Sequence, residues 1–285
     1  MIAAIVAYEQ GYLAGCRQVL DAVRPGFEAG AAGGADGMDA RQWHNLDVYR
    51  RYLGRLLAYR EAHAPRYPAR AVPPLFLVGD SHALAPAGML VAFLGQQWRV
   101  QARLVMGAKA WHLARSAADR YGRAFAIAVD RLPAGATAIA IFGEIDCRAD
   151  EGIVPHASAH PDQPLDPAIA ALVRGYTGFV RSEAARRGVT MHFAGVPAPN
   201  PAAFAGMDVD AGLQSAVART FNALVAVAAA EAGVAFVNVH RLTAVPAGLA
   251  DGRRHIDTHH LLPAVFADAA RAARRGAGTR AARAA

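Results

Sequence analysis

The chain has 285 residues, of which 54% are hydrophobic and 19% are charged, and it contains only two cysteines. This length suits one α/β domain of about 200 residues with a smaller appendage, and the apolar content is sufficient for a sizeable core. Cys16 and Cys147 lie far apart in the sequence. They give no sign of a disulfide framework or of a zinc site built on cysteine pairs.

The formal net charge of +7 suggests a nucleic-acid partner, but the distribution of the charge argues against one. Five positive charges come from arginines in the last fifteen residues, where no acid occurs: Arg271, Arg274, Arg275, Arg280 and Arg283. The rest of the chain therefore carries only +2. We interpret residues 274–285 as a disordered, solvated basic tail; a nucleic-acid-binding arm is the less favoured alternative.

The amino terminus lacks the basic segment of a secretory signal, and Glu9 interrupts its apolar run. No uninterrupted apolar run reaches the length of a membrane span. For the chain as given, we expect a cytoplasmic protein with no membrane and no nucleic-acid partner.

Residues 1–70 are expected to form a small helical segment and a linker. The first 28 residues are rich in alanine, and residues 29–37 form a glycine-rich break. Between residues 40 and 63, apolar residues recur at helical spacing and predict an amphipathic helix. Four prolines between residues 65 and 74 indicate a linker. Protein contacts through these helices are a further expectation.

Residues 71–273 alternate short apolar runs with helical patterns, which predicts a parallel sheet covered on both faces. The runs read as buried strands are 75–78, 136–142, 189–194 and 234–239. Residues 89–94 and the alternating residues 98–106 are expected to pair as a hairpin. We expect a long loop at residues 149–164, a helix opened by the Asp166-Pro167 pair, and a final helix from His255 to about Arg275.

Three polar clusters fall at predicted strand ends or helix starts: residues 79–82, 143–148 and 255–260. Ligands of open α/β sheets bind outside the carboxyl ends of the strands. Ser81 is therefore a candidate nucleophile; the alternative is an ordinary turn with a capping serine. Asp257 and His260 are three residues apart, so one helical turn would place both on one face. Asp257 would orient His260, and His260 would deprotonate Ser81, unless the pair merely begins a solvated helix.

Four blocks in this order resemble the SGNH (GDSL-type) hydrolases: Gly79-Asp80-Ser81, Gly107, Gly143 to Asp146, and Asp257-Thr258-His259-His260. The resemblance covers residues 74–262. It implies a three-layer flavodoxin-like parallel sheet and a Ser-His-Asp site that hydrolyses or transfers acyl esters without a cofactor. By motif, Ser81 would be the nucleophile, His260 the base and Asp257 its partner. The backbone N–H groups of Ser81 and Gly107 would line the oxyanion hole.

One departure from the family pattern concerns the third block, where an asparagine usually donates to the oxyanion. Ile145 stands at that position and cannot donate. Losing one such donor typically costs about 3 kcal/mol of transition-state stabilisation. Arg148 is the candidate substitute; the alternative is that it pairs with Asp146 or Glu144 for structural reasons.

Six further residues are candidates for the pocket: Asp80, His82, Trp111, Glu144, Asp146 and His259. For Trp111, packing on an amphipathic helix is the favoured alternative. The histidines between residues 255 and 260 are too close in sequence to converge on one ion, so we expect no metal. The sequence thus favours an enzyme acting on a small ester, for example an acylated carbohydrate. The alternative is a non-catalytic domain that binds a glycan or acyl ligand.

Overall fold

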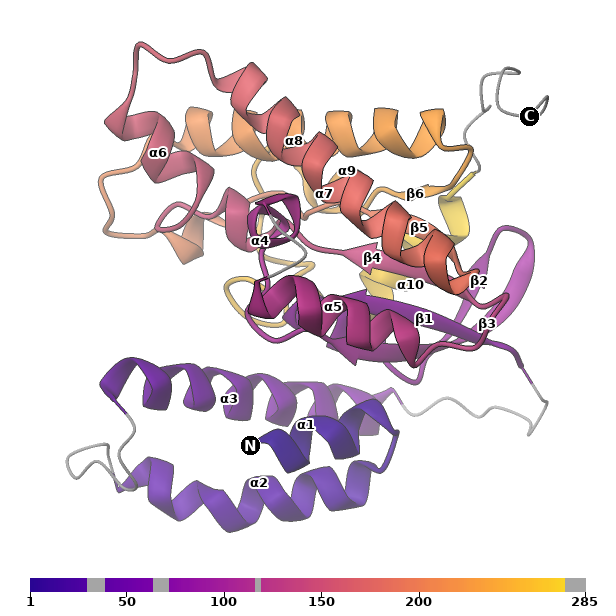
Figure 1. Cartoon of the computed structure of the whole chain (residues 1–285). Coiled ribbons are helices and arrows are strands. Elements are labelled where there is room, and N and C mark those ends of the chain that lie inside the picture. Colours follow the sequence, from indigo (N-terminus) through magenta and orange to yellow (C-terminus); the bar gives the residue numbers. More distant parts are fainter. Residues whose placement is uncertain (30–38, 64–71, 116–118, 275–285) are drawn as a thin grey trace. The chain divides into compact units, whose positions relative to one another are not determined.

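A computed structural model describes residues 1–29, 39–63, 72–115 and 119–274 (Figure 1). The contacts within it divide the chain into two compact units, Met1–Ala71 and Val72–Ala285. Most of the predicted linker and nearly all of the predicted basic tail lie outside the described residues. The two units are described separately below, and the candidate site belongs to the second.

The first unit consists of the helices α1 (Ile2–Glu9), α2 (Leu13–Glu28) and α3 (Ala40–Ala62). α3 begins with a capping box, in which the Asp39 side chain accepts from the backbone N–H of Gln42 and the Gln42 side chain accepts from that of Asp39. The helical spacing between residues 40 and 63 therefore predicted this helix correctly. Phe27 of α2 stacks on Trp43 of α3, with ring centroids 4.4 Å apart.

The second unit is built on a six-stranded sheet in the order β2-β3-β1-β4-β5-β6. Its strands are β1 (Pro74–Gly79), β2 (Leu90–Phe93), β3 (Gln96–Leu104), β4 (Thr137–Ile141), β5 (Thr190–Ala194) and β6 (Phe236–Val237). All neighbours pair in parallel except β2, which forms the expected hairpin with β3. Without β2, the order is that of a flavodoxin-like sheet, which confirms the predicted fold class.

Helices cover the sheet, as the alternation of strand and helix patterns predicted. They are α4 (Ala110–Arg115), α5 (Arg120–Asp130), α6 (Ile153–Ala159), α7 (Leu165–Arg187), α8 (Ala211–Glu231), α9 (His240–Thr243) and α10 (Pro263–Ala272). α5, α7 and α8 pack over one face, where the core includes Phe76, Phe193 and Phe221. α10 runs behind the sheet in Figure 1 and packs against β2 and β6. The sheet therefore lies between helices on its two faces.

Three predicted element boundaries are wrong. Residues 149–164 are not a continuous loop, because α6 forms there and buries Ile153 and Val154. α7 begins at Leu165 after Pro164, so Asp166 lies in its first turn instead of capping it. The segment from His255 is a loop, and the final helix begins only at Pro263, whose fixed φ suits the first helical position.

α8 is long and apolar enough to cross a membrane by length and composition alone. Its side chains Val217, Phe221 and Val225 are fully buried in the core of the α/β unit. Burial in a core is the ordinary reason for such a helix in a globular domain.

Gly79 brings two strands together directly before the candidate nucleophile. Its carbonyl accepts from Val105, and the next residue, Asp80, donates its N–H to the carbonyl of Ile141. A Cβ at Gly79 would lie 2.2 Å from Ile141 Cγ2 and 2.4 Å from its carbonyl oxygen. A side chain there would have to displace the backbone of β4.

We therefore predict that Gly79→Ala lowers the free energy of unfolding by about 1–3 kcal/mol, because the strand ends must separate. The matched control is Gly178→Ala on α7, where a Cβ would meet no atom within 4 Å. That change should stabilise the protein by about 0.5–1 kcal/mol, since alanine favours a helix interior. Urea denaturation measures both, and equal effects of the two changes would contradict the prediction.

Candidate active site

Ser81 begins a short 3₁₀ helix, η2 (Ser81–Leu84), immediately after β1. Asp80 caps this turn, because its Oδ1 accepts from the backbone N–H of His82 at 2.9 Å. β1 lies between β3 and β4, whose chain connections leave the sheet in opposite directions. Ser81 therefore stands at the topological switch point of the sheet, where ligands of such folds bind.

Asp257 and His260 lie in a loop that closes on itself, with a β-bridge between His255 and Leu261. Oδ1 of Asp257 accepts from the backbone N–H groups of His259 and His260 at 2.9 and 2.7 Å. These bonds replace the helical turn expected from the spacing, and they bring the two side chains together equally well.

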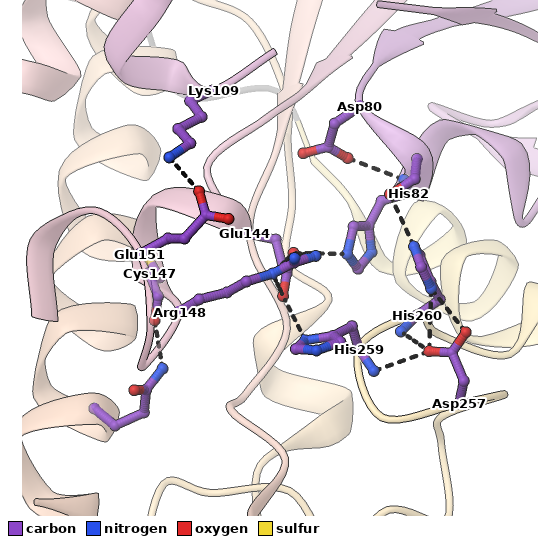
Figure 2. Close-up of polar contacts among 12 residues, drawn as sticks. Asp80, His82, Lys109, Glu144, Cys147, Arg148, Glu151, Asp257, His259 and His260 are labelled. Atoms are coloured by element: carbon purple, nitrogen blue, oxygen red, sulfur yellow. Dashed lines mark hydrogen bonds and ion pairs between the residues drawn. The ribbon is translucent and has the colours of Figure 1, made fainter. Parts of the chain in front are cut away.

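The three candidate catalytic side chains form one hydrogen-bonded chain, which Figure 2 shows in part. Nδ1 of His260 is 2.8 Å from Oδ2 of Asp257, and Nε2 of His260 is 2.8 Å from Oγ of Ser81. An ionised Asp257 can only accept, so Nδ1 of His260 carries the proton and Nε2 accepts from the Ser81 hydroxyl. The predicted contact between Ser81 and His260 is thus present.

Burial keeps His260 neutral, which is the protonation state that a general base requires. It lowers the pKa of His260 to about 4, against the opposing effect of Asp257. Burial would raise the pKa of Asp257, but the hydrogen bonds from His260 and the loop backbone outweigh it and hold the pKa far below its usual value. At neutral pH the pair is therefore a neutral imidazole and a carboxylate.

Two other expected site residues, Gly107 and Asp146, follow the ends of β3 and β4. Gly107 follows β3 in a left-handed conformation (φ 68°), which glycine adopts without strain. Asp146 holds this segment, because its carboxylate accepts from the N–H groups of Ala110 and Trp111 at 2.8 and 3.0 Å. Burial raises the pKa of Asp146 to about 6, although those backbone bonds lower it. Asp146 is thus a structural link to α4, and none of the described hollows has it in its lining.

Arg148 pairs with Glu144, one of the two structural partners left open by the sequence. Its Nε is 2.9 and 3.0 Å from the two carboxylate oxygens, and its Nη2 is 2.6 Å from Oε2. Among the described residues, no hydrogen bond joins Arg148 to Ser81 or Gly107. The role of Arg148 as an oxyanion donor stays a prediction.

Glu144 also contacts two histidines, so it is the centre of a charged cluster (Figure 2). Its Oε2 is 3.4 Å from Nε2 of His82, and its Oε1 is 3.3 Å from Nδ1 of His259. Burial would raise the pKa of Glu144, but Arg148 and the histidines outweigh it and hold the pKa well below its usual range. Burial lowers the pKa of His82, but the nearby Glu144 and Asp80 outweigh it, so the net shift is upward. The sequence indicated these residues as pocket candidates but not their convergence.

Two other expected pocket residues have different surroundings. Asp80 is buried, and its Oδ2 has no hydrogen-bond partner among the described residues. Burial raises its pKa to about 6. Trp111 is 44% exposed and carries the Arg115 guanidinium 4.6 Å from its ring centroid, so it neither packs in the core nor lines a described hollow.

A hollow lies beside the base, with a volume of about 430 Å³ counted with the open solvent at its mouth. Its lining combines apolar and polar residues: Pro197, Phe204, Asn200, Gln214, Thr258 and His259. Ser81 and His260, which are 8% and 4% exposed, do not line it. Sequence reasoning did not identify Asn200, Phe204 or Gln214, which come from loops and from α8 and carry no motif.

Among the described residues, no group of three or more histidine, cysteine, aspartate or glutamate side chains has the arrangement of a metal site.

Comparison with known proteins finds no matching family model and no matching curated protein. Three solved structures are similar. One is a proposed platelet activating factor from Streptococcus pneumonia, with 15% identity, a TM-score of 0.47, and 81% of this chain and 96% of the other covered. A proposed SGNH hydrolase from Slackia heliotrinireducens has 18% identity and a TM-score of 0.38, and the match covers 70% of this chain and 96% of the other. A proposed arylesterase from Agrobacterium tumefaciens has 14% identity and a TM-score of 0.40, and the match covers 70% of this chain and 95% of the other.

The environment of His260 predicts an unusually acidic lower limit of activity. If the neutral imidazole of His260 is the base, its pKa of about 4 instead of 6.5 should keep kcat/KM high down to about pH 5. The same shift makes the folded state lose stability as the pH falls from 6.5 towards 4, since the unfolded chain binds the proton more readily. Ester hydrolysis across this range, with folding followed by circular dichroism, checks both. An acid limb centred at or above pH 6.5 would contradict the prediction.

Proposed function

We propose that this chain is a serine hydrolase or acyltransferase that acts on small O-acyl esters through Ser81, His260 and Asp257. The observation that carries the proposal is the continuous hydrogen-bonded chain from the Ser81 hydroxyl through both nitrogens of His260 to the Asp257 carboxylate. Such an order of hydroxyl, imidazole and carboxylate activates a serine at neutral pH. The SGNH-like order of the sequence blocks agrees with it.

In the proposed reaction, Oγ of Ser81 attacks the ester carbonyl while its proton moves to Nε2 of His260. The tetrahedral intermediate then expels the alcohol, which takes that proton and leaves an acyl group on Ser81. Water, or the hydroxyl of an acceptor, attacks the acyl group next, and His260 again accepts and returns the proton. Asp257 stabilises the imidazolium that forms in each half of the reaction. The N–H groups of Ser81 and Gly107 are the proposed donors to the oxyanion.

Two features support a small acyl group on a hydroxyl-rich alcohol. Ser81 is nearly buried, so only a compact acyl group fits against its hydroxyl. The neighbouring hollow is lined by the polar side chains of Asn200 and Thr258 beside the apolar walls of Pro197 and Phe204. A carbohydrate presents the same mixture of hydroxyl groups and apolar ring faces, so an acylated carbohydrate is the proposed substrate class.

One observation favours the alternative, a non-catalytic domain that binds a glycan or acyl ligand. Ile145 supplies no side-chain donor, and Arg148 is bonded to Glu144. With one donor fewer, turnover would fall about a hundredfold or more below that of a complete oxyanion hole. We favour the enzyme, because a binding domain has no need of an aligned serine, histidine and aspartate.

The proposal predicts measurable hydrolysis of p-nitrophenyl acetate that depends on each member of the chain. Ser81→Ala and His260→Ala should remove at least a thousandfold of kcat, because each breaks the proton path. Asp257→Asn should cost a similar factor, since it favours the wrong tautomer of His260.

His259→Ala is the matched control for His260→Ala, since the ring of His259 pairs with Glu144, whereas the ring of His260 bonds to Ser81. It should retain more activity than His260→Ala by at least a hundredfold. Folded wild-type protein that hydrolyses the ester no faster than Ser81→Ala would support the binding domain instead. A dead His259→Ala variant beside an active His260→Ala variant would overturn the choice of base.

A further inference from the structure

The carboxylate of Glu144 contacts the sequence neighbours of both the candidate nucleophile and the candidate base. His82 follows Ser81, and His259 precedes His260. Oε2 of Glu144 lies 3.4 Å from the ring of His82, and Oε1 lies 3.3 Å from the ring of His259. One side chain at the end of β4 therefore links the turn after β1 to the loop before α10 (Figure 2).

A second contact leads from the same carboxylate to the base itself. The rings of His82 and His260 have centroids 5.1 Å apart and are tilted by 39°. His82 is thus held between Glu144 on one side and the imidazole of His260 on the other. Any movement of the His82 ring changes the space available to the base.

Arg148 fixes the direction of the Glu144 carboxylate. Its Nε and Nη2 bond to that carboxylate from one turn along the chain, and only 13% of the Glu144 side chain is exposed. A buried carboxylate needs such a partner, so the pair has a structural role of its own. Charge neutralisation requires only Arg148, however, and leaves the convergence of two histidines on the same carboxylate unexplained.

We propose that Glu144 is a positioning residue that sets the Ser81 turn and the His260 loop at reacting distance by holding His82 and His259 with one carboxylate. The inference rests on the proposed function, because it assigns Glu144 a part in the same reaction. Catalytic groups must be held within about 0.5 Å of their productive geometry, and supporting hydrogen bonds usually provide this. A misplacement of about 1 Å can cost a hundredfold in rate.

Glu144→Gln tests the proposal, because the amide keeps the volume but has no charge and replaces one carboxylate oxygen with an NH₂ group, so it cannot keep the contacts with Arg148 and both histidines. We expect kcat for p-nitrophenyl acetate to fall by tenfold to a hundredfold with KM changed less than threefold. Glu183→Gln is the matched control: Glu183 is similarly buried (16% exposed) and pairs with Arg186 on α7, away from the site. It should keep the wild-type kcat. A Glu144→Gln variant with the wild-type kcat would overturn the proposal.

A double variant separates positioning from charge balance. The kcat of Glu144→Gln is compared with that of wild type. The kcat of the double variant Glu144→Gln/Arg148→Met is compared with that of Arg148→Met, in which no arginine needs a counterion. If Glu144 acts through the histidines, the loss of kcat appears in both backgrounds. If the loss disappears in the Arg148→Met background, Glu144 serves only Arg148 and the proposal is wrong. If Glu144→Gln alone folds poorly, the double variant, which leaves neither charge unpaired, is compared with wild type, and a wild-type kcat in it would overturn the proposal.

A spectroscopic readout keeps the test independent of turnover. The Nδ1 proton that His260 donates to Asp257 should give a downfield proton resonance, identified by its absence in Asp257→Asn. Glu144→Gln should broaden or shift this resonance, and Glu183→Gln should not. An unchanged resonance in Glu144→Gln would overturn the positioning role. If wild-type protein shows the resonance and its response to Glu144→Gln but hydrolyses no ester, the proposed function fails while the positioning role stands.

Discussion

The hydrogen bond between Ser81 and His260 joins two residues that are 179 positions apart in the sequence. The rest of the α/β unit serves to bring their segments together. β1 must lie in the interior of the sheet for Ser81 to reach the switch point, and the chain must pass through β4, β5 and β6 before it can return with the His260 loop. The close approach at Gly79 and the self-closing loop around Asp257 then fix the two ends of the bond.

The side chains of Ser81, His260, Asp80 and Asp146 are buried, and this determines the electrostatics of the site. Desolvation lowers the pKa of His260 and raises those of Asp80 and Asp146, so each group keeps a defined charge only through specific partners. Asp257 has His260 and two backbone N–H groups, while Glu144 has Arg148 and two histidines. The two carboxylates have distinct proposed roles: Asp257 would orient the base, and Glu144 would hold the neighbours of Ser81 and His260.

The sequence predicted the parallel sheet because short apolar runs bounded by glycine and proline are typical of buried strands. It placed Ser81 correctly because a polar cluster follows such a run. The spacing of Asp257 and His260 predicted their contact, but not the backbone conformation that produces it. The Asp257 carboxylate accepts from the N–H groups of His259 and His260, and this turn brings the two side chains as close as a helical turn would. The convergence on Glu144 was not predictable, because it depends on how three strand and loop ends meet in space. α6 was missed because it is only seven residues long, contains Pro155, and buries only Ile153 and Val154.

The central claim is that His260 and Asp257 activate Ser81, and covalent labelling tests it most directly. A fluorophosphonate reacts with a serine only when a neighbouring base increases its nucleophilicity. Wild-type protein treated with the reagent should gain the mass of one adduct, and peptide mapping should locate it on Ser81. Asp257→Asn should label much more slowly under the same conditions. A folded wild-type protein that gains no adduct, or one labelled on another residue, would contradict the account.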